Sequence, residues 1–337
     1  MTSSTHIDFN ASRRFRRLAL NTVISLYFLI IAGGVVRSTG AGMGCPDWPR
    51  CFGRWVPPTE VSELPVNYKE IYGAKLKGEI EFNPVKTWIE YVNRLTGAFT
   101  GVMIFLTLLA SLPYFRKGPK RIFYYSLAAF ILVGLQGWLG AKVVSSELMP
   151  VMITLHMLLA IVIVFILLYL LTWSNFTKAV FEKGINKDML RRTGWMVIVL
   201  SVIQIVLGTQ VRENMDEVIR ALGYQARHLW IEELDSRFYI HRSFSIIIVA
   251  VNLFWLVRIK KSSKHKSVQN IANACLLVLG VELFSGILMA YLGVPPFAQP
   301  LHLVLAIVMI GLQFVIWLLL DEDKFLSRMN LSREELV

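Results

Sequence analysis

Eight long apolar runs, separated by polar segments, dominate the pattern of the chain. A run of roughly 20 apolar residues can cross about 30 Å of hydrocarbon as a helix, at about 1.5 Å per residue. Hydrophobic residues make up 55% of the 337 residues and charged ones only 17%, so much of the apolar surface needs lipid. The pattern predicts an all-α integral membrane protein with eight transmembrane helices. The runs lie at residues 19–36, 88–112, 122–144, 151–173, 195–211, 239–257, 271–292 and 301–320.

Two short motifs occur twice, in the same order and at nearly the same offset. Tyr91-Val-Asn-Arg94 returns 148 residues later as Tyr239-Ile-His-Arg242, and Leu155-His-Met-Leu-Leu-Ala160 returns 146 residues later as Leu301-His-Leu-Val-Leu-Ala306. Such a repeat indicates two homologous halves. Each half has four spans, so the second half enters the membrane from the same side as the first. We therefore expect two parallel pseudo-symmetric four-helix bundles.

Basic residues gather before the first run and after the second, fourth and sixth runs. Short basic loops stay on the cytoplasmic side, so both termini are predicted to be cytoplasmic. The net charge of +12 then reflects inner loops facing anionic lipid and calls for no nucleic acid partner. The expected segments are a cytoplasmic tail 1–18, an N-terminal half 19–174, a cytoplasmic linker 175–193, a C-terminal half 194–320 and a cytoplasmic tail 321–337.

Three of the six histidines fall in the repeated motifs, at His156, His241 and His302, and Asn93 takes the fourth position. All four begin even-numbered spans, which enter from the predicted outer face. Two such residues at similar depth in one bundle are suited to be opposed axial ligands of a haem. His241 and His302 therefore predict a bis-histidine haem in the C-terminal half. A transition-metal site is a rival use of the same residues, and a capping role is the ordinary alternative for a single histidine.

The two halves differ at the start of the second span of each. When Arg94 is aligned with Arg242, Glu90 stands opposite Phe238. Glu90, Asn93 and Arg94 are spaced i, i+3 and i+4, so they are predicted to share one helix face. An ionisable group at the membrane edge is a functional candidate, although a helix dipole also favours an acidic residue there. We expect the N-terminal half to carry out chemistry and the C-terminal half to hold a haem permanently.

At these residues the chain resembles the haem A synthases, membrane oxidoreductases that convert a methyl group of haem O to a formyl group and serve cytochrome oxidase assembly. The resemblance rests on the segments 33–51 and 90–97 and on the three histidine motifs. It implies that Glu90 serves the oxidation and that the N-terminal half receives haem O as substrate. It also implies that His241 and His302 ligate a haem b.

One position departs from the family pattern. The expected Glu-x-x-His-Arg reads Glu-Tyr-Val-Asn-Arg here, with Asn93 in the histidine position. One hypothesis is that His156 alone ligates the substrate haem, and that the face near Asn93 and Glu90 stays open for oxygen or water. The alternative is that Asn93 only hydrogen-bonds a propionate or a backbone group.

Two cysteines and four arginines complete the candidate site. Cys45 and Cys51 lie in the first outer loop, a placement that favours a disulfide, although the spacing leaves a structural bridge, a redox-active pair and free thiols open. The arginines end or begin spans at the depth expected for haem propionates, and arginine suits bidentate pairing with carboxylates. Interfacial snorkelling is their alternative role. They are Arg37 and Arg94 for the substrate haem and Arg212 and Arg242 for haem b.

The mechanism that the resemblance implies is two successive oxidations of the haem methyl group, to an alcohol and then to a hydrated aldehyde that loses water. The expected partners are a haem O synthase (a farnesyltransferase), an electron donor, cytochrome oxidase assembly factors and membrane lipid. The expected location is the bacterial cell membrane, with the haem ligands near the outer face. A non-catalytic di-haem electron-transfer or haem-relay protein is the alternative function, for which Glu90 would be dispensable.

Overall fold

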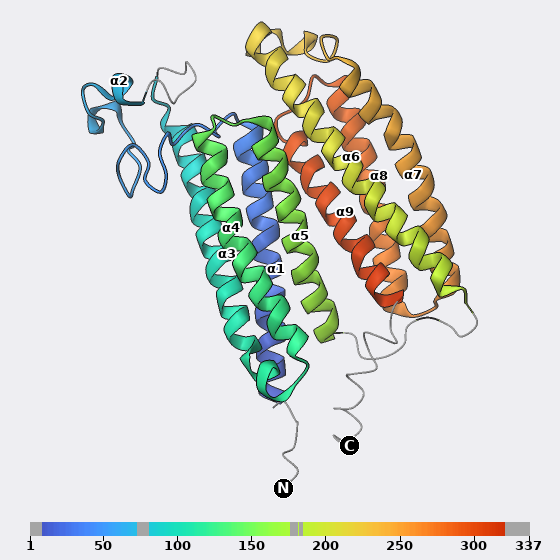
Figure 1. Ribbon diagram of the computed structural model, residues 1–337. Coiled ribbons are helices and arrows are strands. Elements are labelled where there is room, and N and C mark those ends of the chain that lie inside the picture. Colours follow the sequence, from blue (N-terminus) through green and yellow to red (C-terminus); the bar gives the residue numbers. More distant parts are fainter. Residues whose placement is uncertain (1–8, 73–80, 176–180, 182–184, 321–337) are drawn as a thin grey trace.

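The computed structural model describes residues 9–72, 81–175, 181 and 185–320. Within them, eight helices are long and apolar enough to cross a membrane (Figure 1). The prediction of an all-α, multi-pass membrane protein with eight spans is confirmed. The spans are α1 (Phe9–Ser38), α3 (Pro84–Lys117), α4 (Lys120–Ser145), α5 (Pro150–Asn175), α6 (Lys187–Leu222), α7 (Ser236–Ser262), α8 (Lys266–Tyr291) and α9 (Ala298–Leu320). The same described residues also form three short helices between spans: η1 (Val61–Glu63), α2 (Tyr68–Tyr72) and η3 (Tyr224–Leu229).

The helices extend past the apolar runs that predict them. α1 begins at Phe9, inside the expected N-terminal tail. α6 begins at Lys187, inside the expected linker, where the Asn186 side chain accepts a hydrogen bond from the backbone N of Met189 (2.9 Å). It continues to Leu222, well beyond its apolar run. Apolar length therefore predicts the part of a helix that meets lipid, whereas capping residues in the polar segments set its ends.

The spans pack as two groups of four (Figure 1). In the first group α1 contacts α3 and α5, and α4 lies against α3 and α5. In the second group α6 contacts α7 and α9, and α8 lies against α7 and α9. The first group comes from the chain before the expected linker and the second from the chain after it, whereas two homologous halves with a pseudo-symmetric relation stay a prediction.

The two groups meet along α9, which packs against α1 and α5. Gly34 of α1 lies so close to Pro300 that a Cβ added to the glycine would be 3.0 Å from the proline Cβ. Farther along the contact, the ring of Phe165 in α5 stacks on that of Phe314 in α9, with centroids 4.4 Å apart. Buried side chains of both groups, including Ile310 of α9, belong to one apolar cluster. The halves therefore share a core.

All four repeated polar positions lie at one end of the molecule. Asn93, His156, His241 and His302 fall in the first three turns of α3, α5, α7 and α9. These four helices start at the end that carries α2 and the connection from α6 to α7 (Figure 1). The four positions therefore share one end of the molecule, whereas a common depth in the membrane and the assignment of this end to its outer side stay predictions.

Candidate functional site

Each of the three motif histidines faces a glycine of the preceding span. The missing side chain lets the imidazole ring approach the neighbouring helix backbone, as glycine allows at close helix contacts. An added Cβ would lie 3.4 Å from the ring Cε1 for Gly140 and His156, 3.3 Å for Gly208 and His241, and 3.4 Å for Gly286 and His302. The rings therefore fill space that a side chain on the preceding helix would otherwise occupy.

Asn93 occupies the same kind of place in the first half. A Cβ on Gly33 of α1 would lie 3.9 Å from the Asn93 Oδ1, which is buried without a hydrogen-bond partner among the described residues. Asn93 also lines an open, largely apolar cavity of about 590 Å³ between the ends of α1 and α3. Val35 and Trp88 contribute to its wall. An apolar cavity suits a large apolar ligand, and the free amide oxygen beside it could accept a hydrogen bond from a polar group of that ligand.

His241 and His302 lie close together in the second half, with ring centroids 6.4 Å apart and ring planes at 72°. A bond from a first-row metal to an imidazole nitrogen is about 2 Å long, and the ring centre lies about 1 Å behind that nitrogen. Two imidazoles bound to opposite faces of one iron would therefore have centroids about 6 Å apart. The observed separation fits a haem iron between the two rings.

The rival transition-metal interpretation would need further ligands. Within the part of the chain that the structure describes, no group of three or more His, Cys, Asp or Glu side chains is placed to hold a metal ion.

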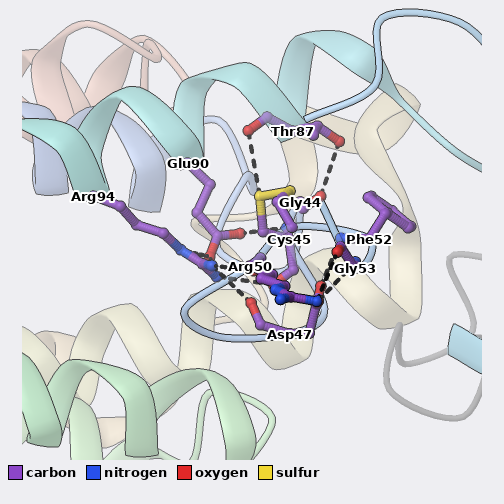
Figure 2. Close-up of a disulfide and its surroundings, with 10 residues drawn as sticks. Gly44, Cys45, Asp47, Arg50, Phe52, Gly53, Thr87, Glu90 and Arg94 are labelled. Atoms are coloured by element: carbon purple, nitrogen blue, oxygen red, sulfur yellow. Dashed lines mark hydrogen bonds and ion pairs between the residues drawn. A yellow bond between two sulfur atoms is a disulfide. The ribbon is translucent and has the colours of Figure 1, made fainter. Parts of the chain in front are cut away.

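Glu90 is buried, with 3% of its surface exposed, under the loop that follows α1 (Figure 2). Its Oε2 accepts a hydrogen bond from the backbone N of Cys45 (2.7 Å), and its Oε1 accepts one from the Nε of Arg94 (3.1 Å). Arg94 also donates to the carbonyl oxygens of Cys45 (3.0 Å), Asp47 (2.7 Å) and Arg50 (3.0 Å). This ion pair therefore fastens the loop to α3 and fixes the position of the Glu90 carboxylate.

The loop is closed by a disulfide between Cys45 and Cys51 (Figure 2). The prediction of a disulfide is confirmed and the free-thiol alternative is wrong, whereas the choice between a structural and a redox-active bridge stays open. Gly44 brings the loop backbone against the first turn of α3, where an added Cβ would lie 2.5 Å from the carbonyl oxygen of Lys86. The Thr87 hydroxyl donates to the Gly44 carbonyl oxygen (2.8 Å). Only glycine fits this contact.

The shared face predicted for three residues of α3 is seen in part. Glu90 and Arg94 both point to the disulfide loop, as Figure 2 shows. Asn93 instead faces Gly33 of α1 and the cavity. Arg94 was expected to bind a propionate of the substrate haem. Its guanidinium instead donates hydrogen bonds to carbonyl oxygens of the disulfide loop.

Arg37 and Arg212 end the apolar parts of α1 and α6 and meet at the junction of the halves. Both form ion pairs with Asp216, and the distance between the Arg212 guanidinium and the Asp216 carboxylate is 2.9 Å. Arg212 also donates a hydrogen bond to the backbone carbonyl oxygen of Arg37 (3.2 Å). Asp216 could not be predicted from sequence because it lies beyond the apolar run, and the continuation of α6 places it one turn after Arg212. The guanidinium of Arg242 lies over the ring of Tyr239, 5.8 Å from its centroid.

Comparison with known proteins identifies the family. Residues 16–314 match the family described as "Cytochrome oxidase assembly protein". The chain belongs to this family. Curated relatives of the chain carry the name haem A synthase, so the resemblance inferred from the motifs is confirmed.

Three of these relatives show how far the similarity extends. The haem A synthase of Bartonella bacilliformis is 24% identical over 309 residues, which cover 82% of this chain and 84% of that protein. The haem A synthase of Rickettsia prowazekii is 25% identical over 329 residues, covering 87% of this chain and 93% of that protein. The match to the haem A synthase of Shewanella oneidensis is 29% identical over 153 residues and covers 45% of this chain and 43% of that protein.

The contact of Gly44 with α3 gives a testable prediction. Replacing Gly44 by Ala should push the loop off α3, because the new Cβ would meet rigid backbone at 2.5 Å, and should weaken the hydrogen bond from Cys45 to Glu90. Amide hydrogen exchange in residues 44–52, followed by mass spectrometry, should become at least roughly tenfold faster. Gly42→Ala is the matched control, because its Cβ would meet only the side-chain end of Leu148, at 3.2 Å. Equal exchange in the two variants would contradict the prediction.

Proposed function

We propose that this protein is a haem A synthase, an oxidoreductase that converts a methyl group of haem O to a formyl group during cytochrome oxidase assembly. The family match over residues 16–314 and the names of the relatives support this function. The single observation that carries the catalytic part is the buried Glu90 carboxylate, which the Arg94 guanidinium and the Cys45 amide hold in one position.

The C-terminal half holds haem b between His241 and His302. The 6.4 Å separation of the two ring centroids supports this assignment. When bound there, haem b supplies a one-electron redox centre. Arg212 and Arg242 lie at the same end of this half and are assigned to its propionates, which matches the preference of arginine for carboxylates.

The N-terminal half receives haem O as substrate. His156 is its axial ligand, and Asn93 leaves the opposite face open. The unpartnered Oδ1 of Asn93 and the adjoining apolar cavity support this arrangement. Arg37 is assigned to a propionate of the substrate, whereas Arg94 acts mainly by holding the loop and Glu90.

The substrate methyl group is oxidised twice, first to an alcohol and then to a hydrated aldehyde that loses water. Glu90 accepts a proton or stabilises positive charge that develops beside the porphyrin. Because both of its oxygens are already bound, the carboxylate does not need to reorient during the reaction. The disulfide loop above it excludes water from that side.

The proposed surroundings follow from the chemistry of the substrate. Haem O is too apolar to be released freely, so a haem O synthase is the partner that delivers it, and an electron carrier serves the oxidation. The protein lies in the bacterial cell membrane with both termini in the cytoplasm and the haem ligands near the outer face, as the basic inner loops indicate.

The catalytic assignment is tested by replacing Glu90 with Gln in cells that also express a haem O source. Haem A, measured by pigment extraction and mass spectrometry, should fall by at least about 100-fold, because the charge that the reaction uses is lost. Glu63→Gln, which changes an exposed loop carboxylate, should leave haem A unchanged. If haem O is supplied and neither Glu90→Gln nor the wild type makes haem A, the alternative of a di-haem electron-transfer protein replaces this proposal.

The assignment of the two haem sites is tested by three alanine variants. His241→Ala and His302→Ala should each lose most of the haem b absorbance of the purified protein, because one axial bond is removed. His156→Ala should keep haem b and lose haem A formation. His228→Ala, a change in the exposed part of η3, serves as control. Full haem b retention in the double variant of His241 and His302 would exclude this pair as ligands.

The open face at Asn93 is tested by Asn93→His. A second imidazole would close that face of the substrate iron, so the initial rate of haem A formation should fall roughly tenfold or more. Haem b content should stay at the wild-type level and shows that the second half is intact. An unchanged rate would leave Asn93 with only the hydrogen-bonding role.

A further inference from the structure

α8 carries a carboxylate inside the membrane span that the proposed mechanism does not use. Glu282 stands four residues before the glycine that faces His302. The corresponding positions in α4 and α6 are Gln136 and Gln204. Each glutamine donates from its Nε2 to the backbone carbonyl oxygen of a histidine, to that of His156 (2.9 Å) and to that of His241 (3.1 Å). A carboxylate has no amide N–H, so Glu282 cannot reproduce this contact in its ionised form.

Glu282 contacts the imidazole ring itself. Its Oε1 lies 3.4 Å from the Nδ1 of His302, and the Oγ of Ser285 lies 2.8 Å from the same nitrogen. The Ser285 hydroxyl donates its proton to the backbone carbonyl oxygen of Glu282 (2.8 Å). Because a serine hydroxyl has only one proton, its oxygen accepts from His302. The tautomer that satisfies both contacts of the hydroxyl carries hydrogen on Nδ1 and leaves the lone pair of Nε2 available to an iron.

The other two motif histidines lack this support. The Nδ1 atoms of His156 and His241 are buried without a hydrogen-bond partner among the described residues. Of the three motif histidines, His302 is the one whose Nδ1 lies near both a hydroxyl and a carboxylate.

The charge of Glu282 also needs a partner. Its side chain is 19% exposed, and its Oε2 is buried without a hydrogen-bond partner in the part of the chain that the structure describes. A buried carboxylate is costly unless an opposite charge lies nearby. The iron and porphyrin of an oxidised haem together carry one positive charge, which is lost on reduction. A haem bound by His302 would therefore supply the missing positive charge in its oxidised state.

We propose that Glu282, together with Ser285, is a positioning residue that fixes His302 as an Nε2 ligand and lowers the reduction potential of the haem b in the second half. This inference rests on the proposed function for the presence of that haem. A carboxylate on the far nitrogen makes an imidazole more basic and stabilises the ferric state. The lower potential makes this haem a better electron donor to the substrate half.

The experiment is a redox titration of haem b absorbance in purified wild type, Glu282→Gln and Ser285→Ala, expressed without a haem O source. Glu282→Gln keeps the shape and removes the charge. It should raise the ratio of ferrous to ferric haem at a fixed potential roughly tenfold. This corresponds to an increase of about 59 mV in the reduction potential of a one-electron couple. Haem affinity should fall about 10-fold, as is usual when a partner of a metal ligand is lost. Ser285→Ala should shift the ratio in the same direction by a smaller factor.

Glu213→Gln is the matched control, because Glu213 pairs with Arg237 of α7 (3.9 Å) and belongs to no histidine contact. Its titration should superimpose on that of the wild type. Potentials and haem affinities that stay unchanged in both Glu282→Gln and Ser285→Ala would overturn this inference and leave the proposed function standing. A wild-type protein that binds no haem b would instead remove the haem b assignment and this inference together. If Glu282→Gln does not fold, Ser285→Ala decides alone.

Discussion

The ligand residues can enter the bundles because the preceding helix has no side chain at their level. Glycine at these contacts lets α1 approach α3, α4 approach α5, α6 approach α7 and α8 approach α9, with the ring or amide lying in the gap. A methyl group would reach van der Waals contact with the ring or amide at these sites, so any side chain longer than that of alanine would displace either the ring or amide or the helix, because packed interiors have little spare volume. The position of each candidate ligand therefore depends on two helices that are consecutive spans in the chain. The glycines are Gly33, Gly140, Gly208 and Gly286.

The same framework is specialised differently in the two halves. In the first half, the buried acid Glu90 faces outward to the disulfide loop and is neutralised by Arg94. In the second half, the half-buried acid Glu282 faces His302, and no Lys or Arg of the described residues is paired with it.

Much of this arrangement could be predicted from sequence, because its signals are local or repeated. Apolar run length gave the eight spans, and the duplicated motifs placed His156, His241 and His302 at one end. The contacts of Arg94 could not be predicted, since they join α3 to a loop more than 40 residues away in the chain. Asp216 was missed because the polar end of α6 is not marked by hydrophobicity. An alignment of Glu282 with Gln136 and Gln204 would have revealed the unusual acid.

The apolar core that crosses the junction has a thermodynamic consequence. Side chains of α5, α6 and α9 belong to one cluster, so neither half can unfold without breaking van der Waals packing contacts of the other. The halves therefore form one cooperative unit, and a ligand that binds the folded state of one half stabilises both by mass action. Loading of a resident cofactor into the second half would thus raise the stability of the first half before any substrate arrives, without a contact between the two sites.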